Sequence, residues 1–107
     1  MNNDANVARI HREMARWRIL MTLQAGRPYP VSEHLLWTVI ADLRLPMTQQ
    51  DVRREMGYLE DKGLIAIAGK DTVKGWDGEL TGLGVDVVEY TVPAPEGVGR
   101  PQLPARG

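Results

Sequence analysis

The chain has 107 residues, which is enough for one compact domain with a single hydrophobic core and too few for two. Its 43% apolar and 25% charged residues, without an apolar run of about 20 residues or an export signal, predict a cytoplasmic protein with no membrane contact. Cysteine is absent, which excludes disulfides and thiol chemistry, and 13 basic against 14 acidic residues give a net charge of −1.

The first predicted element is a long amphipathic helix over about residues 6–25. Gly26 can end this helix, and Pro28 and Pro30 prevent the helix from continuing. Its apolar stripe, at alternating steps of three and four residues, consists of Val7, Ile10, Met14, Trp17 and Met21. This stripe is longer than a domain of this size needs to cover, so we expect a homodimer that forms through this helix.

A second helix is predicted over about residues 32–43. Ser32 is a suitable N-cap, and Glu33 suits the positive end of the helix dipole. The apolar positions that define the helix are Leu35, Leu36, Val39, Ile40 and Leu43. Their density indicates that one face of this helix packs against the core.

A third helix is predicted over about residues 48–62. Pro46 separates it from the second helix, and Thr48 with Asp51 three residues later forms a variant of the capping box. Only about four residues connect the two helices, so they must cross closely. That geometry is typical of a helix-turn-helix.

The faces of the third helix divide by residue type. We expect the core to receive Val52, Met56 and Leu59. The residues expected to face solvent are Gln49, Gln50, Arg53, Arg54 and Gly57. Arginine and glutamine suit phosphate and base-edge contacts in a DNA groove, although a solvated face of paired charges is the alternative. The acids of this helix outnumber its bases, which disfavours tight DNA binding.

A β-hairpin wing is predicted over about residues 64–80. Gly63 ends the third helix, Ile65 and Ile67 alternate with alanines as in a strand, and the tip lies within residues 69–78. Lys70 and Lys74 are candidates for DNA contact on this wing, and Trp76 is expected to pack beneath it. Thr81 then caps a short final helix that carries Leu83, Val87 and Tyr90.

The last part of the chain, residues 93–107, contains four prolines and three glycines and little apolar surface. We expect a flexible tail behind a single domain of residues 1–92. The fold class is therefore α+β, mostly α: a winged helix-turn-helix with a three-helix core and a β-hairpin wing.

Two sequence phrases resemble winged-helix domains of the ArsR and MarR type: YLEDKGLIAI at residues 58–67 and ELTGLGVDVVEY at residues 79–90. The second phrase, together with GVGRP at residues 97–101, is similar more narrowly to a small winged-helix family of Mu-like bacteriophages and prophages. The resemblance implies a DNA-binding fold and a phage context, in the bacterial or host cytoplasm.

The residues and the resemblance together favour a phage or prophage transcriptional regulator that binds double-stranded DNA. The site expected to do so consists of Gln49, Gln50, Arg53, Arg54, Lys70 and Lys74. The alternative is a non-enzymatic protein-protein interaction module in phage assembly or DNA packaging. His11 and His34 lie on different helices without the spacing of a metal or catalytic site, so we expect no metal, no cofactor and no enzymatic activity.

Overall fold

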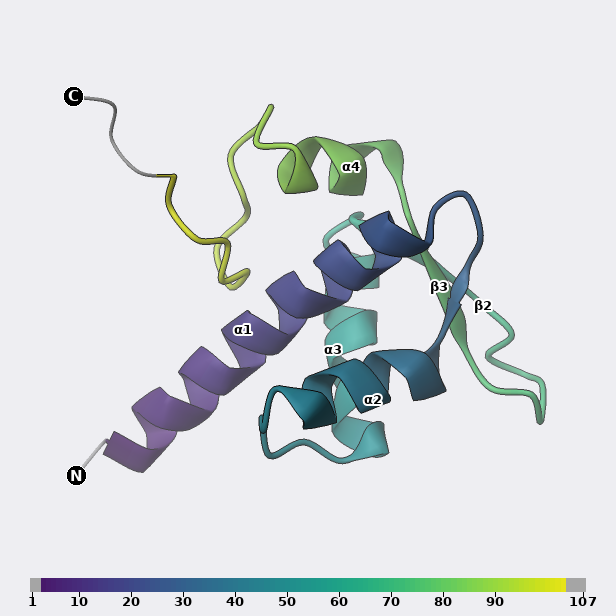
Figure 1. Ribbon diagram of the computed structural model, residues 1–107, viewed down its shortest axis with the longest axis horizontal. Coiled ribbons are helices and arrows are strands. Elements are labelled where there is room, and N and C mark those ends of the chain that lie inside the picture. The colour runs from purple at the N-terminus through teal and green to yellow at the C-terminus, as the bar shows by residue number, and fades with distance from the viewer. Residues whose placement is uncertain (1–2, 104–107) are drawn as a thin grey trace.

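The computed structural model describes residues 3–103 and contains four helices and one three-stranded antiparallel sheet (Figure 1). The elements in chain order are α1 (Asn3–Gly26), β1 (Val31–Ser32), α2 (Glu33–Asp42), α3 (Gln49–Asp61), β2 (Ile65–Ala68), β3 (Asp77–Leu80) and α4 (Gly82–Val88). The predicted α+β class with mostly helical content is confirmed. The predicted helices and strands agree with the observed ones to within a few residues.

Side-chain caps fix the starts of three helices. Ser32 accepts a hydrogen bond from the backbone N–H of Leu35, which starts α2. Thr48 and Asp51 form the reciprocal capping box at the start of α3, with bonds of 3.1 and 2.9 Å. Thr81 accepts a hydrogen bond from the backbone N–H of Gly84, which starts α4. All three predicted caps are therefore confirmed, because each of these side chains satisfies a backbone N–H that the first turn leaves unpaired.

The strand β3 lies in the centre of the sheet, between β1 and β2. It pairs with β2 as a hairpin, and with β1 through Val31 opposite Gly78. Because β1 leads directly into α2, this pairing holds the hairpin beside the start of α2 (Figure 1). The sheet therefore positions the hairpin relative to the two central helices.

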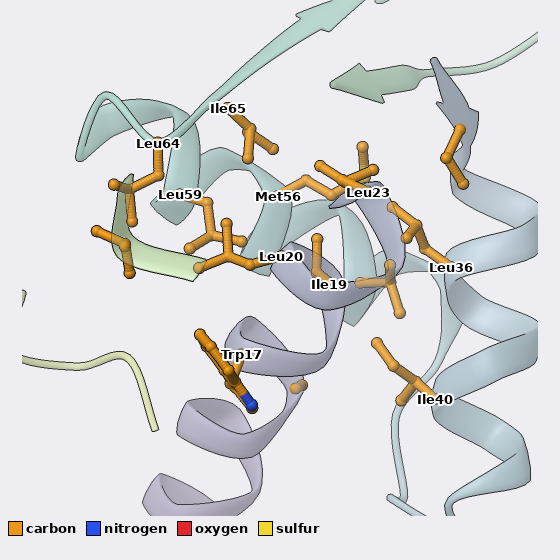
Figure 2. Close-up of a cluster of buried hydrophobic side chains, with 14 of the residues drawn as sticks. Trp17, Ile19, Leu20, Leu23, Leu36, Ile40, Met56, Leu59, Leu64 and Ile65 are labelled. Atoms are coloured by element: carbon orange, nitrogen blue, oxygen red, sulfur yellow. The ribbon is translucent and has the colours of Figure 1, made fainter. Parts of the chain in front are cut away.

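The core lies where α1 crosses α2 and α3 and meets the sheet (Figure 2). Its largest buried apolar side chains from the helices are Ile19, Leu20, Leu23, Leu36, Ile40, Val52, Met56, Leu59 and Val87. The three residues of α3 predicted to face inward are all fully buried. None of the helices in residues 3–103 has both the length and the apolar character needed to cross a membrane.

The predicted apolar stripe of α1 is mostly not part of this core. Only Trp17 is buried, whereas the other four side chains are 40–49% exposed. The face of α1 that packs inward instead carries Ala15, Ile19, Leu20 and Leu23. α1 thus has two apolar stripes. The stripe of Ala15, Ile19, Leu20 and Leu23 is buried because it packs against α2, α3 and β3.

The C-terminal segment contacts the domain, contrary to the expected undocked tail. The carbonyl oxygen of Gly97 accepts a hydrogen bond from Arg16 at 2.8 Å, and that of Glu96 accepts one from the Tyr58 hydroxyl at 3.0 Å. The backbone N–H of Gly99 donates to the carbonyl of Glu13, and Val98 packs against the core. Backbone groups supply most of these contacts, so a low apolar content does not prevent docking. Residues 104–107 lie outside the described part.

Ending the chain after Val92 should lower the melting temperature by about 5–15 °C, because the hydrogen bonds to Arg16 and Tyr58 and the packing of Val98 are lost together. Tyr58→Phe removes only one of these bonds and should produce a clearly smaller decrease. Thermal unfolding followed by circular dichroism measures both. An unchanged melting temperature in the truncated chain would show that the docked segment does not stabilise the domain.

Candidate nucleic-acid interface

A cleft of about 340 Å³ opens between the first turns of α2 and α3 and the tip of the hairpin. We call it the α3–hairpin cleft. It is lined by Ser32, Glu33, His34, Gln49, Gln50, Arg53, Val73, Lys74 and Gly75. Polar side chains therefore converge here from α2, α3 and the hairpin.

Four of the six predicted site residues lie in this cleft, namely Gln49, Gln50, Arg53 and Lys74. The other two lie elsewhere. Arg54 lines a second cavity, of about 210 Å³, with His11 and Arg12 of α1. Lys70 forms an ion pair with Glu60 at 2.6 Å and lies over the ring of Trp76. The structure thus brings the two glutamines, one arginine and one lysine together.

Arg53, which the helical pattern places on the solvent side of α3, lines the cleft but is only partly exposed and is held by a partner. Its Nε and Nη2 atoms donate to the two carboxylate oxygens of Glu33 at 2.7 Å each, and its side chain is only 35% exposed. Its guanidinium also lies 4.8 Å from the ring centre of Trp76. A fork of two parallel hydrogen bonds holds an arginine in one orientation. Arg53 therefore lines the cleft with its guanidinium held in place by Glu33.

Glu33 connects three parts of the molecule. Its buried carboxylate accepts from Arg53 of α3 and from the backbone N–H of Trp76 in the hairpin, at 2.6 Å. Its own N–H donates to the carbonyl of Trp76. Trp76 packs against the core, as expected for this residue. One carboxylate thus fixes the distance between the start of α2, the body of α3 and the hairpin.

The charge states in the cleft follow from these contacts. The hydrogen bonds from Arg53 hold the pKa of Glu33 below its usual range, with burial acting in the opposite direction and the Trp76 N–H adding to the decrease. The same pair raises the pKa of Arg53. The backbone N–H of Thr48 lowers the pKa of Asp51 at the helix start. All these groups stay ionised at neutral pH.

Ion pairs within the domain neutralise most of the acidic load on α3. Glu55 is fully buried and accepts from Arg16 of α1 at 2.7 Å. Glu60 pairs with Lys70, and Asp51 caps the helix and lies 3.2 Å from Arg54. Counting these acids as free negative charges overstates the repulsion that a phosphate would meet.

The residues of this cleft that the sequence did not indicate are Ser32, Glu33, His34, Val73 and Gly75. Val73 is fully exposed at the hairpin tip. The sequence around Glu33 indicates only that it lies at the start of a helix. Its partners Arg53 and Trp76 are distant in sequence, so the pairing follows from the tertiary fold alone.

No three histidine, aspartate or glutamate side chains of residues 3–103 lie close enough together to hold a metal ion. Comparison with protein-family models, with curated proteins and with solved structures finds no match to this chain. The chemistry of the cleft is therefore the basis for an assignment of function.

Proposed function

We propose that this protein is a winged helix-turn-helix that binds double-stranded DNA through the α3–hairpin cleft. In this proposal the first turns of α3 enter the major groove and the hairpin acts as the wing beside it. The element order, the short connection between α2 and α3 and the position of the hairpin next to them support it.

The observation that carries the proposal is the convergence of Gln49, Gln50 and Lys74 on one polar cleft from two separate elements. A glutamine amide can donate to and accept from the edge of an adenine, and it can also donate to phosphate. Lysine suits phosphate as a point charge. Both glutamines are exposed in the first turn of α3, where a recognition helix makes its base contacts.

The paired state of Arg53 gives it a different role from the one expected. Its hydrogen-bonding fork is already occupied by Glu33, so we assign it to holding the wing against α3. Arg54 is 67% exposed and faces the second cavity with Arg12. In this proposal Arg54 and Arg12 contact the DNA backbone beside the groove.

The biological role within this proposal is that of a non-enzymatic transcriptional regulator of a phage or prophage. This role depends on the resemblance of residues 58–67, 79–90 and 97–101 to winged-helix proteins, including a small family of Mu-like bacteriophages and prophages. A net charge of −1 predicts that affinity depends on base contacts more than on general attraction to phosphate.

Replacing both Gln49 and Gln50 by alanine should weaken specific DNA binding about 30-fold or more, because base contacts of this kind contribute roughly 1–3 kcal/mol each. Replacing Lys74 by alanine should reduce the salt dependence of binding by about one unit of slope. Fluorescence anisotropy at two salt concentrations, with fragments from the genomic neighbourhood of the gene, measures both effects.

Matched controls are Gln102→Ala and Arg27→Ala, which remove an exposed amide and an exposed charge outside the cleft. Both should bind as the parent does. If the parent shows no affinity tighter than the nonspecific range of about 10⁻⁴ to 10⁻⁶ M, or if the cleft variants match the controls, the proposal is wrong.

A second candidate function is a protein-protein interaction module in phage assembly or DNA packaging. The observation that favours it is the exposed apolar face of α1. A parent protein that binds no DNA fragment in the anisotropy experiment would make this the better account.

A further inference from the structure

The N-terminal part of α1 extends away from the rest of the domain (Figure 1). Every side chain from residue 4 to residue 10 is exposed, including those of Val7 and Ile10. A helix end of about two turns is marginally stable in water unless it packs against something. This free end therefore presents apolar side chains without a partner among the described residues.

An apolar stripe continues along α1 with the spacing of a coiled-coil seam. It consists of Val7, Ile10, Met14, Trp17 and Met21, at steps of three, four, three and four residues, and all of these side chains except Trp17 are exposed. This alternation averages 3.5 residues, which is the spacing that lets two helices pack along a common seam. The face therefore fits a helical partner.

An apolar groove of about 370 Å³ lies beside the C-terminal half of the same stripe. Its floor is α1, one wall is the end of α2 with the loop after it, and the other wall is the docked C-terminal segment. The lining residues are Met14, Trp17, Arg18, Met21, Leu43, Leu45, Gly99 and Pro101. The molecule thus carries an apolar groove and an apolar free helix end on one helix.

We propose that two copies of this chain pair antiparallel through α1, so that the free helix end of each copy lies in the groove of the other. Antiparallel seams place the first apolar position of a heptad opposite the fourth position of the partner helix. In the register that this requires, Val7 faces the partner's Trp17 and Ile10 faces the partner's Met14. Each contact occurs twice, as the two-fold symmetry of a homodimer demands.

Charge complementarity supports this register. The positions that flank the seam bring Asp4 opposite the partner's Arg18, and Arg18 lines the groove. Symmetry makes two such pairs per dimer. A parallel pairing would leave both grooves unfilled and Asp4 without a facing base. Glu13 flanks the seam in either orientation, opposite the partner's Glu13 in the antiparallel pair and opposite the partner's Arg18 in a parallel one, and Arg9 of its own helix pairs with it. The filling of the groove therefore decides the orientation, and the pair of Asp4 with Arg18 fits it.

This dimer does not depend on the proposed DNA binding, because its surface lies outside the α3–hairpin cleft. Failure of one proposal leaves the other intact. The oligomeric state and the helix register are measured without DNA.

Sedimentation equilibrium of the full chain should give a dimer at micromolar concentration. Ile10→Glu should raise the dimer Kd about 100-fold or more, because it places two carboxylates in an apolar seam. Its melting temperature, measured where both proteins are monomeric, should match the parent, since Ile10 is exposed within one copy. Val73→Glu changes an apolar residue at the hairpin tip that is even more exposed than Ile10, and it should leave the dimer unchanged. A monomeric parent at hundreds of micromolar, or a dimeric Ile10→Glu variant, overturns the proposal.

Cysteine crosslinking tests the register, because the natural chain contains no cysteine. A mixture of Ile10→Cys and Met14→Cys proteins should oxidise mainly to the mixed disulfide, whereas either variant alone should crosslink slowly. Rapid crosslinking of each variant with itself and none between them would indicate a parallel pairing and overturn the antiparallel register.

A charge exchange tests the flanking pair. Asp4→Lys alone should raise the dimer Kd roughly 2- to 10-fold, and Asp4→Lys combined with Arg18→Asp should restore it. If the combined variant is no tighter than Asp4→Lys alone, Asp4 does not face Arg18 and the register is wrong.

Discussion

The free energy of unfolding should fall by about 3–5 kcal/mol when Arg16 is replaced by methionine. The reason is Glu55, whose carboxylate is fully buried and whose hydrogen bond from Arg16 measures 2.7 Å. Methionine fills much of the same volume but leaves that carboxylate without its cation. The variant also loses the bond from Arg16 to Gly97 and the stacking of the guanidinium over Tyr58, at 3.6 Å from the ring centre. Urea denaturation at neutral pH measures the change.

Two variants separate the buried pair from other effects of the substitution. Arg9→Met breaks an exposed ion pair with Glu13 on the same helix and should cost less than about 1 kcal/mol. Combining Arg16→Met with Glu55→Met removes both charges and should recover most of the lost stability, because apolar pairs often replace buried ion pairs without loss. If Arg16→Met is no worse than Arg9→Met, the buried pair is not a determinant of stability.

Replacing Glu33 by glutamine should lower the free energy of unfolding by about 2–3 kcal/mol. The carboxylate accepts three hydrogen bonds, two from Arg53 and one from the N–H of Trp76. A glutamine has only one oxygen, and its NH₂ group would face another donor. The hairpin should loosen from α3 as a result, which hydrogen exchange of the Trp76 amide would report as faster exchange.

The pH dependence gives an independent measurement of the same contact. The pKa of Glu33 is lower in the folded protein than its usual value of 4.5, so the stability that its charge supplies is complete above that pH and is lost as the pH falls below it. Glu33→Gln should therefore lose less stability than the parent on acidification from about pH 6 to pH 3. Equal losses would show that Glu33 is not responsible.

Arg53 and Arg54 form a matched pair of neighbours with different surroundings. Arg53→Ala should lower the melting temperature clearly, because Glu33 stays buried without its main donor. Arg54→Ala removes an exposed arginine near Asp51 and should hardly change it. Equal melting temperatures would contradict the structural role assigned to Arg53.

The local parts of this fold were predictable because their signals lie within a few residues of one another. The hydroxyls of Ser32, Thr48 and Thr81 each accept a hydrogen bond from the backbone N–H three residues later, and the Asp51 carboxylate accepts one from the N–H of Thr48. Gly63, with a φ of +76°, ends α3 as expected. Helix and strand bounds follow from such local chemistry.

Long-range choices were not predictable in the same way. A period of three and four residues identifies α1 as a helix, but two apolar stripes satisfy it, and only the positions of α2, α3 and the sheet decide which one is buried. The pairing of Arg53 with Glu33 likewise joins two helices. The docked C-terminal segment depends on backbone carbonyls, which every residue has and which composition therefore does not reveal.

The candidate site was predicted in part. An outward-facing first turn of α3 follows from the helical pattern, so Gln49 and Gln50 were identified. Lys74 was identified as part of the hairpin, while its position in the same cleft depends on β1 pairing with β3. His34 lies in the first turn of α2. Its place in the cleft depends on the pairing of β1 with β3, which brings the hairpin beside that turn.

Synthesis of the chain on the ribosome must reach β3 before the sheet can form, because this last strand is the central one. A nascent chain that ends before residue 77 has β1 and β2 but no strand to join them. The edges of β1 and β2 that β3 later pairs are then open, and the apolar side chains beside them are exposed. Such edges recruit other chains, so incomplete products of this gene should be substrates for chaperones and proteases, whereas the finished domain closes the sheet in a single late step.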